Sequence, residues 1–180
     1  MKAITIYNPW AMLIALSYKQ YETRAWWANY RGKIAIHAGL SKEFLPSPAG
    51  VEEFASLLGI DESVAGKIIK LNAETLGHVV AVAELVDCVR SEKLRSEISD
   101  REHHLGDYSD KRYGWKLINI VPIKPVKVRG QQGLWDIDLA GQIEHVSKEI
   151  YSLSCSNLPA GQLTRIAADP LSISPEDLEG

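Results

Sequence analysis

Residues 8–31, NPWAMLIALSYKQYETRAWWANYR, decide how this chain folds. Asn8 is a residue type that caps helix N-termini and Pro9 suits the first helical position, so we expect a helix to begin here. The apolar face of this helix has helical spacing and consists of Trp10, Leu13, Ile14 and Leu16. The C-terminal end of the helix then points at Lys19.

The segment after this helix predicts a strand. Residues 21–24 alternate as a β-strand does, with successive side chains on opposite faces. Glu22 and Arg24 therefore share one face, and Thr23 points to the other. We expect Lys19, Glu22 and Arg24 to converge at one corner, where two cations keep the carboxylate ionised and leave positive charge to hold an anion or polarise a carbonyl. A structural ion-pair cluster that caps the helix is the alternative.

The spacing in this corner resembles the signature of a known family. The run Lys19-x-x-Glu22-x-Arg24 is similar to the motif G-x-K-x-x-[E/T]-x-R of the ASCH domain, the activating-signal-cointegrator homology branch of the PUA-like superfamily. Ser17 stands at the glycine position of the motif, and Glu22 stands at the [E/T] position. The corner thus matches the family at its charged positions.

Four further segments carry the same resemblance: residues 3–14, 30–38, 112–117 and 129–135. The resemblance covers roughly residues 1–140 and is that of bacterial and phage-type members. It implies an α+β fold, a PUA-like small mixed β-barrel with flanking helices.

The remaining strands and helices fit this fold. Strand-like runs cover residues 2–7, 33–37, 79–89 and 113–123, and Pro122 and Pro125 end the last strand or confine it to an edge of the sheet.

Residues 41–76 predict a helical insertion between barrel strands, because their apolar residues recur at helical spacing between Pro and Gly interruptions. A closing amphipathic helix is expected from Ile137 to about Leu153. We therefore expect an ASCH-type, PUA-like domain over residues 1–153 and a C-terminal tail over residues 154–180 that is docked or flexible.

The first functional hypothesis is a binding module. The resemblance implies recognition of RNA, single-stranded nucleic acid or a modified nucleoside in a cleft beside the first helix. Lys19 and Arg24 would contact phosphate or base oxygens, and Glu22 would accept from an exocyclic amine or hold the two cations. The expected ligand-binding residues are Lys19, Glu22, Arg24, Trp10, Trp26, Arg31, His37 and Trp115.

Individual residues of this set also have structural alternatives. The tryptophans offer stacking faces for a base, or they close the barrel. His37 lies in a strand, where a satisfied structural group is the alternative. In a later loop, the amides of Gln131 and Gln132 stand between two glycines and could reach base edges.

The second hypothesis is a small amidohydrolase. Some ASCH proteins remove the acyl group from N-acylated cytidine, using a Lys, a Thr at the [E/T] position as nucleophile, and a Glu from a later strand. Glu22 replaces that Thr here and would activate water, while Lys19 stabilises the oxyanion. The catalytic residues would then be Lys19, Glu22 and Glu84, with a solvent-facing Glu84 as the alternative.

Composition indicates an ordinary globular protein. The 180 residues are 46% hydrophobic and 24% charged, and no apolar run approaches the ~20 residues of a membrane span. No leader-like segment opens the chain, so we expect a cytoplasmic protein without membrane contact. Its oligomeric state is left open.

The distribution of charge and the spacing of possible metal ligands limit which ligands and cofactors we expect. The net charge is −3, yet the first 40 residues carry five Lys or Arg and one acidic residue, which favours selective contact with a small anionic or nucleotide-like target. Cys88 and Cys155 are too few and too far apart for a zinc site, and the adjacent His103 and His104 lack further ligands. We expect no metal and no cofactor.

Overall fold

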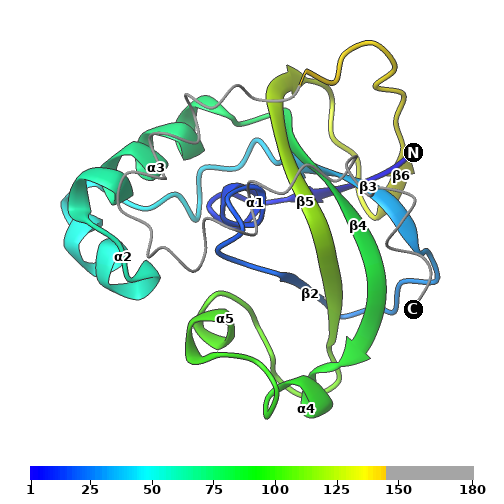
Figure 1. Cartoon of the computed structure of the whole chain (residues 1–180), viewed down its shortest axis with the longest axis horizontal. Helices are drawn as coiled ribbons and strands as arrows, with labels where there is room; N and C mark the ends of the chain where they lie inside the picture. The colour runs from blue at the N-terminus through cyan, green and yellow to red at the C-terminus, as the bar shows by residue number, and fades with distance from the viewer. Residues whose placement is uncertain (145–180) are drawn as a thin grey trace, which may run out of the picture.

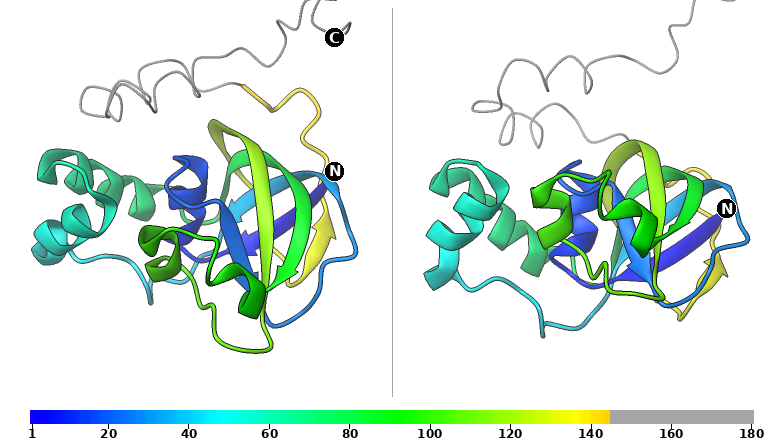
Figure 2. Two further views of the ribbon diagram at one scale, coloured as in Figure 1. Left: turned by 60° about the horizontal axis from the view of Figure 1, so that its bottom comes forward. Right: turned by 90° about the horizontal axis from the view of Figure 1, so that it is seen from below.

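The structure, a computed structural model, describes residues 1–144, which form a curled six-stranded mixed sheet. The strands are β1 (Lys2–Ile6), β2 (Tyr21–Arg24), β3 (Gly32–Ala38), β4 (His78–Arg90), β5 (Tyr113–Lys127) and β6 (Leu134–Asp136). Their order is β2-β5-β4-β3-β1-β6, with β1 and β3 parallel and the other neighbours antiparallel. The sheet curls into a half-barrel (Figure 1, Figure 2), which confirms the expected α+β fold with a mixed, curved sheet and flanking helices.

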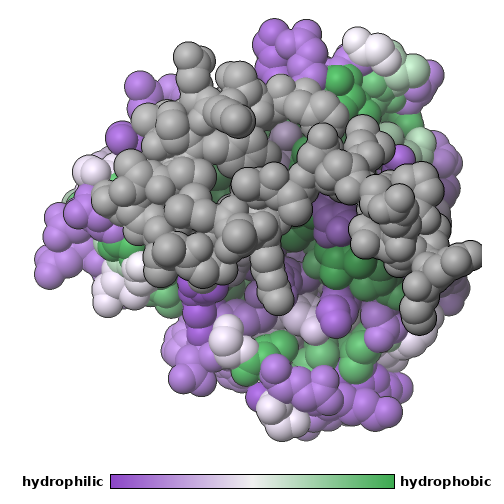
Figure 3. Space-filling model, viewed as in Figure 1, coloured by the Kyte–Doolittle hydropathy of each residue, from purple (hydrophilic) through white to green (hydrophobic). Residues whose placement is uncertain are grey.

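The helices of the described part flank this sheet. They are α1 (Trp10–Ala15), α2 (Val51–Leu58), α3 (Glu62–Glu74), α4 (Ser91–Leu94) and α5 (Asp100–His104). Helices α2 and α3 lie together on one side of the sheet, next to α1 (Figure 2), and confirm the predicted helical insertion. Hydrophilic side chains predominate over the outer side of this insertion (Figure 3). None of the helices in residues 1–144 is long and apolar enough to cross a membrane.

Helix α1 is buried on all sides. Each residue from Ala11 to Ala15 is at most 6% exposed. Ile14 belongs to the core beneath the sheet, whereas Leu13 packs with Phe54 and Ile68 of the insertion. The predicted single apolar stripe was therefore too narrow, because α1 lies between two layers and a helix in that position is apolar all round.

Asn8 does not cap α1, which corrects the prediction from the sequence. Pro9 holds the N-cap position, and no side chain caps the helix there. Asn8 is fully buried, and its Nδ2 donates to the carbonyl oxygen of Asn72 at 2.7 Å and to Oγ1 of Thr75 at 3.1 Å. The side chain thus ties the start of α1 to the end of α3, two elements that are far apart in the sequence.

Strand β5 continues through its prolines, and they lie at an edge. Its first residues pair with β2 on one side and with β4 on the other, but β2 reaches only as far as Lys116. Pro122 and Pro125 lie beyond that point, where β4 is the only strand beside β5 in the described part. Of the two outcomes that the prolines predicted, confinement to an edge is correct and termination is wrong.

The chain after β6 is not helical as far as the structure describes it. Residues 137–144 form no helix, although a helix was predicted from Ile137 onwards. The backbone N–H of Lys124 in β5 donates a hydrogen bond to the carbonyl oxygen of Glu144 at 3.0 Å and so holds this segment against the sheet. The rest of that predicted helix and the predicted tail lie outside the described residues.

Replacing Asn8 should destabilise the domain without touching the sheet. We expect Asn8→Ala to lower the free energy of unfolding by about 1–3 kcal/mol, because two buried hydrogen bonds are lost. Chemical denaturation measures this change. Asn29→Ala, at an exposed position in the β2–β3 connection, is the control and should leave stability within about 0.5 kcal/mol. Equal stability of both variants would contradict the role of Asn8.

Candidate functional site

A cleft of about 820 Å³ lies where α1, β2 and the β5–β6 loop meet. Its lining includes five residues that the sequence had singled out for ligand binding: Trp10, Lys19, Glu22, Arg24 and Trp26. Gln131 and Gln132 line it from the β5–β6 loop, although the sequence alone did not place this loop beside the corner. The helix-to-strand corner and this distant loop therefore share one cavity.

Glu22 and Arg24 form the ion pair that strand alternation predicts. Nε of Arg24 lies 2.9 Å from Oε1 of Glu22, and Nη2 of Arg24 donates to the carbonyl oxygen of Thr5 at 2.8 Å. Burial raises the pKa of Glu22, and the nearby charges of Arg24 and Lys19 offset only part of that rise. The expectation that two cations keep this carboxylate ionised thus underestimated the effect of burial.

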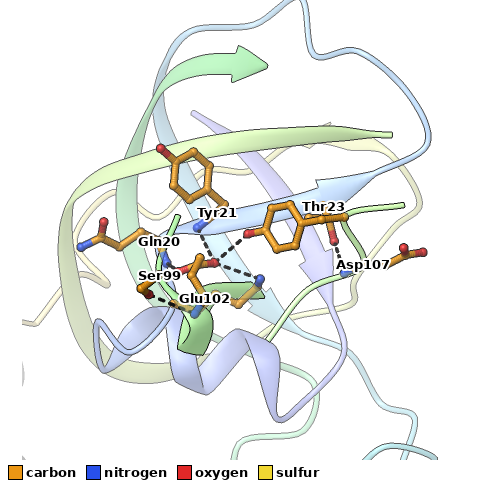
Figure 4. A network of polar contacts seen from close by, with 8 residues as sticks. Gln20, Tyr21, Thr23, Ser99, Glu102 and Asp107 are labelled. Atoms are coloured by element: carbon orange, nitrogen blue, oxygen red, sulfur yellow. Dashed lines mark hydrogen bonds and ion pairs between the residues drawn. The ribbon is translucent and has the colours of Figure 1, made fainter. Parts of the chain in front are cut away.

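Lys19 is held by a carboxylate that the sequence had not assigned to the site. Its Nζ lies 3.4 Å from Oε1 of Glu102 in α5, and Lys19 and Glu102 are only 1% and 7% exposed. The Glu102 carboxylate also accepts the N–H groups of Gln20 at 2.8 Å and Tyr21 at 3.3 Å. Figure 4 shows these bonds converging on Glu102.

The same carboxylate accepts the hydroxyl of Tyr108 at 2.9 Å. Burial raises the pKa of Tyr108, and the charge of Glu102 adds to the rise, so the hydroxyl stays protonated and remains a donor. Sequence reasoning had considered the segment around Glu102 only for metal. The pattern Ser99-x-x-Glu102 is that of a capping box, and Oγ of Ser99 does accept the Glu102 N–H. This pattern could have located α5, but it does not reveal that the carboxylate turns towards Lys19.

Aromatic rings form the walls of the cleft. On one side Phe44 lies 5.5 Å from Tyr7 and 5.1 Å from Trp10, measured between ring centroids. Trp26 lines the cleft and stands edge-on to Trp115 at 4.5 Å. Sequence reasoning missed Tyr7 and Phe44, because Phe44 belongs to the segment that was interpreted only as helical insertion. The cleft thus offers exposed ring faces, which suit a flat aromatic ligand.

Four of the predicted site residues lie outside the cleft. Trp115 is fully buried and donates from Nε1 to the carbonyl oxygen of Trp26 at 3.3 Å. His37 is 1% exposed beside the carbonyl oxygen of Val128, and burial lowers its pKa. For both residues, a structural role within the core fits their surroundings better than ligand binding in the cleft.

Glu84 and Arg31 also lie away from the cleft lining. Glu84 accepts from Nδ2 of Asn119 at 3.0 Å, so it does not lie beside Lys19. Arg31 folds back on its own segment and donates from Nη1 to the carbonyl oxygen of Ala28 at 2.7 Å. The sequence thus predicted correctly that Glu84 lies in a strand, but its proposed place beside Lys19 in the cleft is wrong.

Thr23 and Arg112 border the cleft on the side of α5. Thr23 was expected on the face opposite Glu22, yet it also lines the cavity, because the 105–107 segment extends the lining beyond one strand face. Its Oγ1 accepts the N–H of Asp107 at 3.2 Å (Figure 4). Arg112 places its Nε 3.1 Å from Oδ2 of the same Asp107.

The charges of the cleft are nearly balanced. Each of the three cations has an acidic partner, namely Lys19 with Glu102, Arg24 with Glu22, and Arg112 with Asp107. The surplus of positive charge expected from the sequence is therefore small. A cleft of alternating donors and acceptors suits the polar edge of a heterocycle better than a cluster of phosphates. Within residues 1–144 no cluster of three metal-ligating side chains occurs.

Comparisons with known proteins agree with the motif. No protein-family model matches the chain. The chain is 25% identical over 139 residues to Activating signal cointegrator 1 of Homo sapiens, and 24% identical over 139 residues to the Mus musculus protein of that name. These matches cover 75% of this chain but only 22% of either relative, so the chain spans a small part of their length.

Solved structures of an ASCH protein are also similar. ASCH from Zymomonas mobilis is 14% identical with a TM-score of 0.44, covering 85% of this chain and 92% of that chain. A single-substitution mutant of the same protein is 16% identical with a TM-score of 0.46, covering 85% of this chain and 95% of that chain.

Removing the Glu102 carboxylate should destabilise the domain strongly. Glu102→Ala leaves the Lys19 ammonium buried without its partner, and we expect a loss of about 3–5 kcal/mol in the free energy of unfolding. Tyr108→Phe removes one hydrogen bond and should cost about 1 kcal/mol.

Urea denaturation compares these variants. Glu97→Ala, an exposed carboxylate from the same segment, is the matched control and should change stability by less than about 0.5 kcal/mol. A Glu102→Ala protein as stable as that control would show that the buried network contributes nothing.

Proposed function

We infer that this chain, an ASCH-domain protein of the PUA-like superfamily, binds RNA, single-stranded nucleic acid or a modified nucleoside through one base held in the cleft. The observation that carries this proposal is the pairing of exposed aromatic walls with a floor of Lys19, Glu22 and Arg24 in one cavity. Stacking on such walls is available to every base, and the polar floor can read the base edge.

The individual groups have complementary roles in this proposal. Trp10 and Trp26, which both line the cleft, supply ring faces. Arg24 and Lys19 donate to base carbonyls or to a phosphate oxygen, and Glu22 accepts from an exocyclic amine. Gln131 and Gln132 can both donate and accept at the rim. The balanced charge supports modest affinity for a base rather than broad attraction to polyanions.

Binding should depend on the cations of the floor. Wild-type protein should bind single-stranded oligonucleotides weakly, and affinity should fall as salt rises. Arg24→Ala and Lys19→Gln should weaken binding by about tenfold, because each removes a charge-assisted hydrogen bond. Fluorescence anisotropy at several salt concentrations measures this effect.

The control for these variants is Lys70→Ala, an exposed charge on α3, which should bind as wild type does. Thermal unfolding of Lys19→Gln is measured alongside, since this residue also stabilises the fold. No binding at low salt, or binding indifferent to both floor variants, contradicts the proposal.

A second candidate is hydrolysis of an N-acylated nucleoside, and the raised pKa of buried Glu22 beside Lys19 favours it. A carboxyl group with a raised pKa is a better general base, and a cation can stabilise an oxyanion. Glu84 has no part in this version, since it lies away from the cleft.

Turnover separates the two candidates. For a binding module we expect wild type to release no acid from a panel of N-acylated nucleosides. Catalytic release that rises with pH through the raised pKa of Glu22 and disappears in Glu22→Gln would instead support the hydrolase, because only the ionised carboxylate acts as a base. Glu22→Thr is the informative partner variant, since it restores the hydroxyl that the resembled hydrolases use.

A further inference from the structure

A row of aromatic and cationic side chains lies beside the cleft, on the β2–β3 connection and on adjoining strand ends; its members are exposed except for Tyr113, which is half-buried. Trp27 is 46% exposed, and its ring stands edge-on to Tyr113 at 5.6 Å between centroids. The guanidinium of Arg31 lies 5.5 Å from the Trp27 ring, and that of Arg90 lies 5.2 Å from the Tyr113 ring. Arg31, Trp27, Tyr113 and Arg90 thus form one arginine–aromatic row, and none of them lines the cleft.

The row begins next to the cleft. Trp27 directly follows Trp26, a cleft residue, so their Cα atoms are about 3.8 Å apart. Tyr113 is paired with Arg24 across β2 and β5, and with Arg90 across β4 and β5. The row therefore runs from the cleft across the end of the sheet at which β4 ends and β5 begins (Figure 1).

The charge of the row is positive and open to solvent. Arg31 has a loose ion pair with Asp87, at 3.6 Å between exposed side chains, which solvent weakens. Arg90 is exposed and forms no ion pair within residues 1–144. Unlike the cleft, where every cation has an acidic partner at closer range or in a buried setting, this row retains a cation for an external anion.

We propose that the arginine–aromatic row binds the nucleotides next to the one held in the cleft, so that the ligand is a single-stranded nucleic acid and not a free nucleoside. Unpaired bases stack on Trp27 and Tyr113, and Arg31 and Arg90 contact the phosphates between them. This inference rests on the proposed function and extends it, because it decides between a polymer and a monomer.

Affinity as a function of ligand length tests the proposal. Nucleoside monophosphates and single strands of about 8 nucleotides, a length within the site sizes of small β-barrel domains, are titrated against each variant. We expect the longer strand to bind more tightly than the monophosphate. Trp27→Ala and Arg90→Ala should each weaken binding of the longer strand by about tenfold and leave monophosphate binding unchanged.

Matched variants separate this inference from the proposed function. Trp27→Phe keeps a stacking face and should largely restore binding, whereas Lys70→Ala should have no effect at either length. One outcome contradicts the proposal: Arg24→Ala weakens binding of both the monophosphate and the longer strand, while Trp27→Ala and Arg90→Ala weaken binding of neither. In that case the cleft binds a monomer, and the row is not a nucleic-acid surface but has another role, such as contact with an acidic protein segment. If Trp27→Ala weakens the strand but Arg24→Ala does not, the row stands and the proposed function of the cleft fails.

Discussion

Lys19 and Glu102 form an ion pair away from water, and the geometry of the cleft depends on it. Moving two charges out of water costs several kcal/mol for each ion, and their attraction repays this only when further hydrogen bonds satisfy the remaining groups. Glu102 meets that condition through two backbone N–H groups and the Tyr108 hydroxyl. Helix α5 is thereby attached to the corner between α1 and β2.

The burial of α1 holds the other side of the same corner. Because the sheet and the α2–α3 insertion cover this helix on opposite sides, its end can scarcely shift without disturbing two cores. Asn8 adds a polar tie between the start of α1 and the end of α3. The residues that follow α1, and Lys19 in particular, are therefore presented from a rigid element, which favours a binding site of defined geometry.

Local sequence patterns predicted most strands and helices of this fold well. They predicted poorly which residues from distant parts of the chain lie next to each other. Alternation placed Glu22 and Arg24 together because a strand face depends only on residues two apart. It could not tell which face of β3 or β4 meets a cavity, so His37 and Glu84 were assigned to a cleft that neither lines. Glu102 lies 83 residues from Lys19, and no local pattern reports a contact at that separation. The rise in the pKa of Glu22 was missed for the same reason, since desolvation depends on the whole fold.

The prolines of β5 affect the tendency of the protein to associate with other copies of itself through its sheet edge. A free sheet edge exposes unpaired N–H and C=O groups and can recruit a strand from another chain. Pro122 and Pro125 carry no N–H, and the N–H of Lys124 between them is already bonded to Glu144. At the opposite edge β6 is only three residues long. The uncovered stretch of β5 and the short β6 are thus poor templates for strand addition, which disfavours edge-to-edge pairing at these two places.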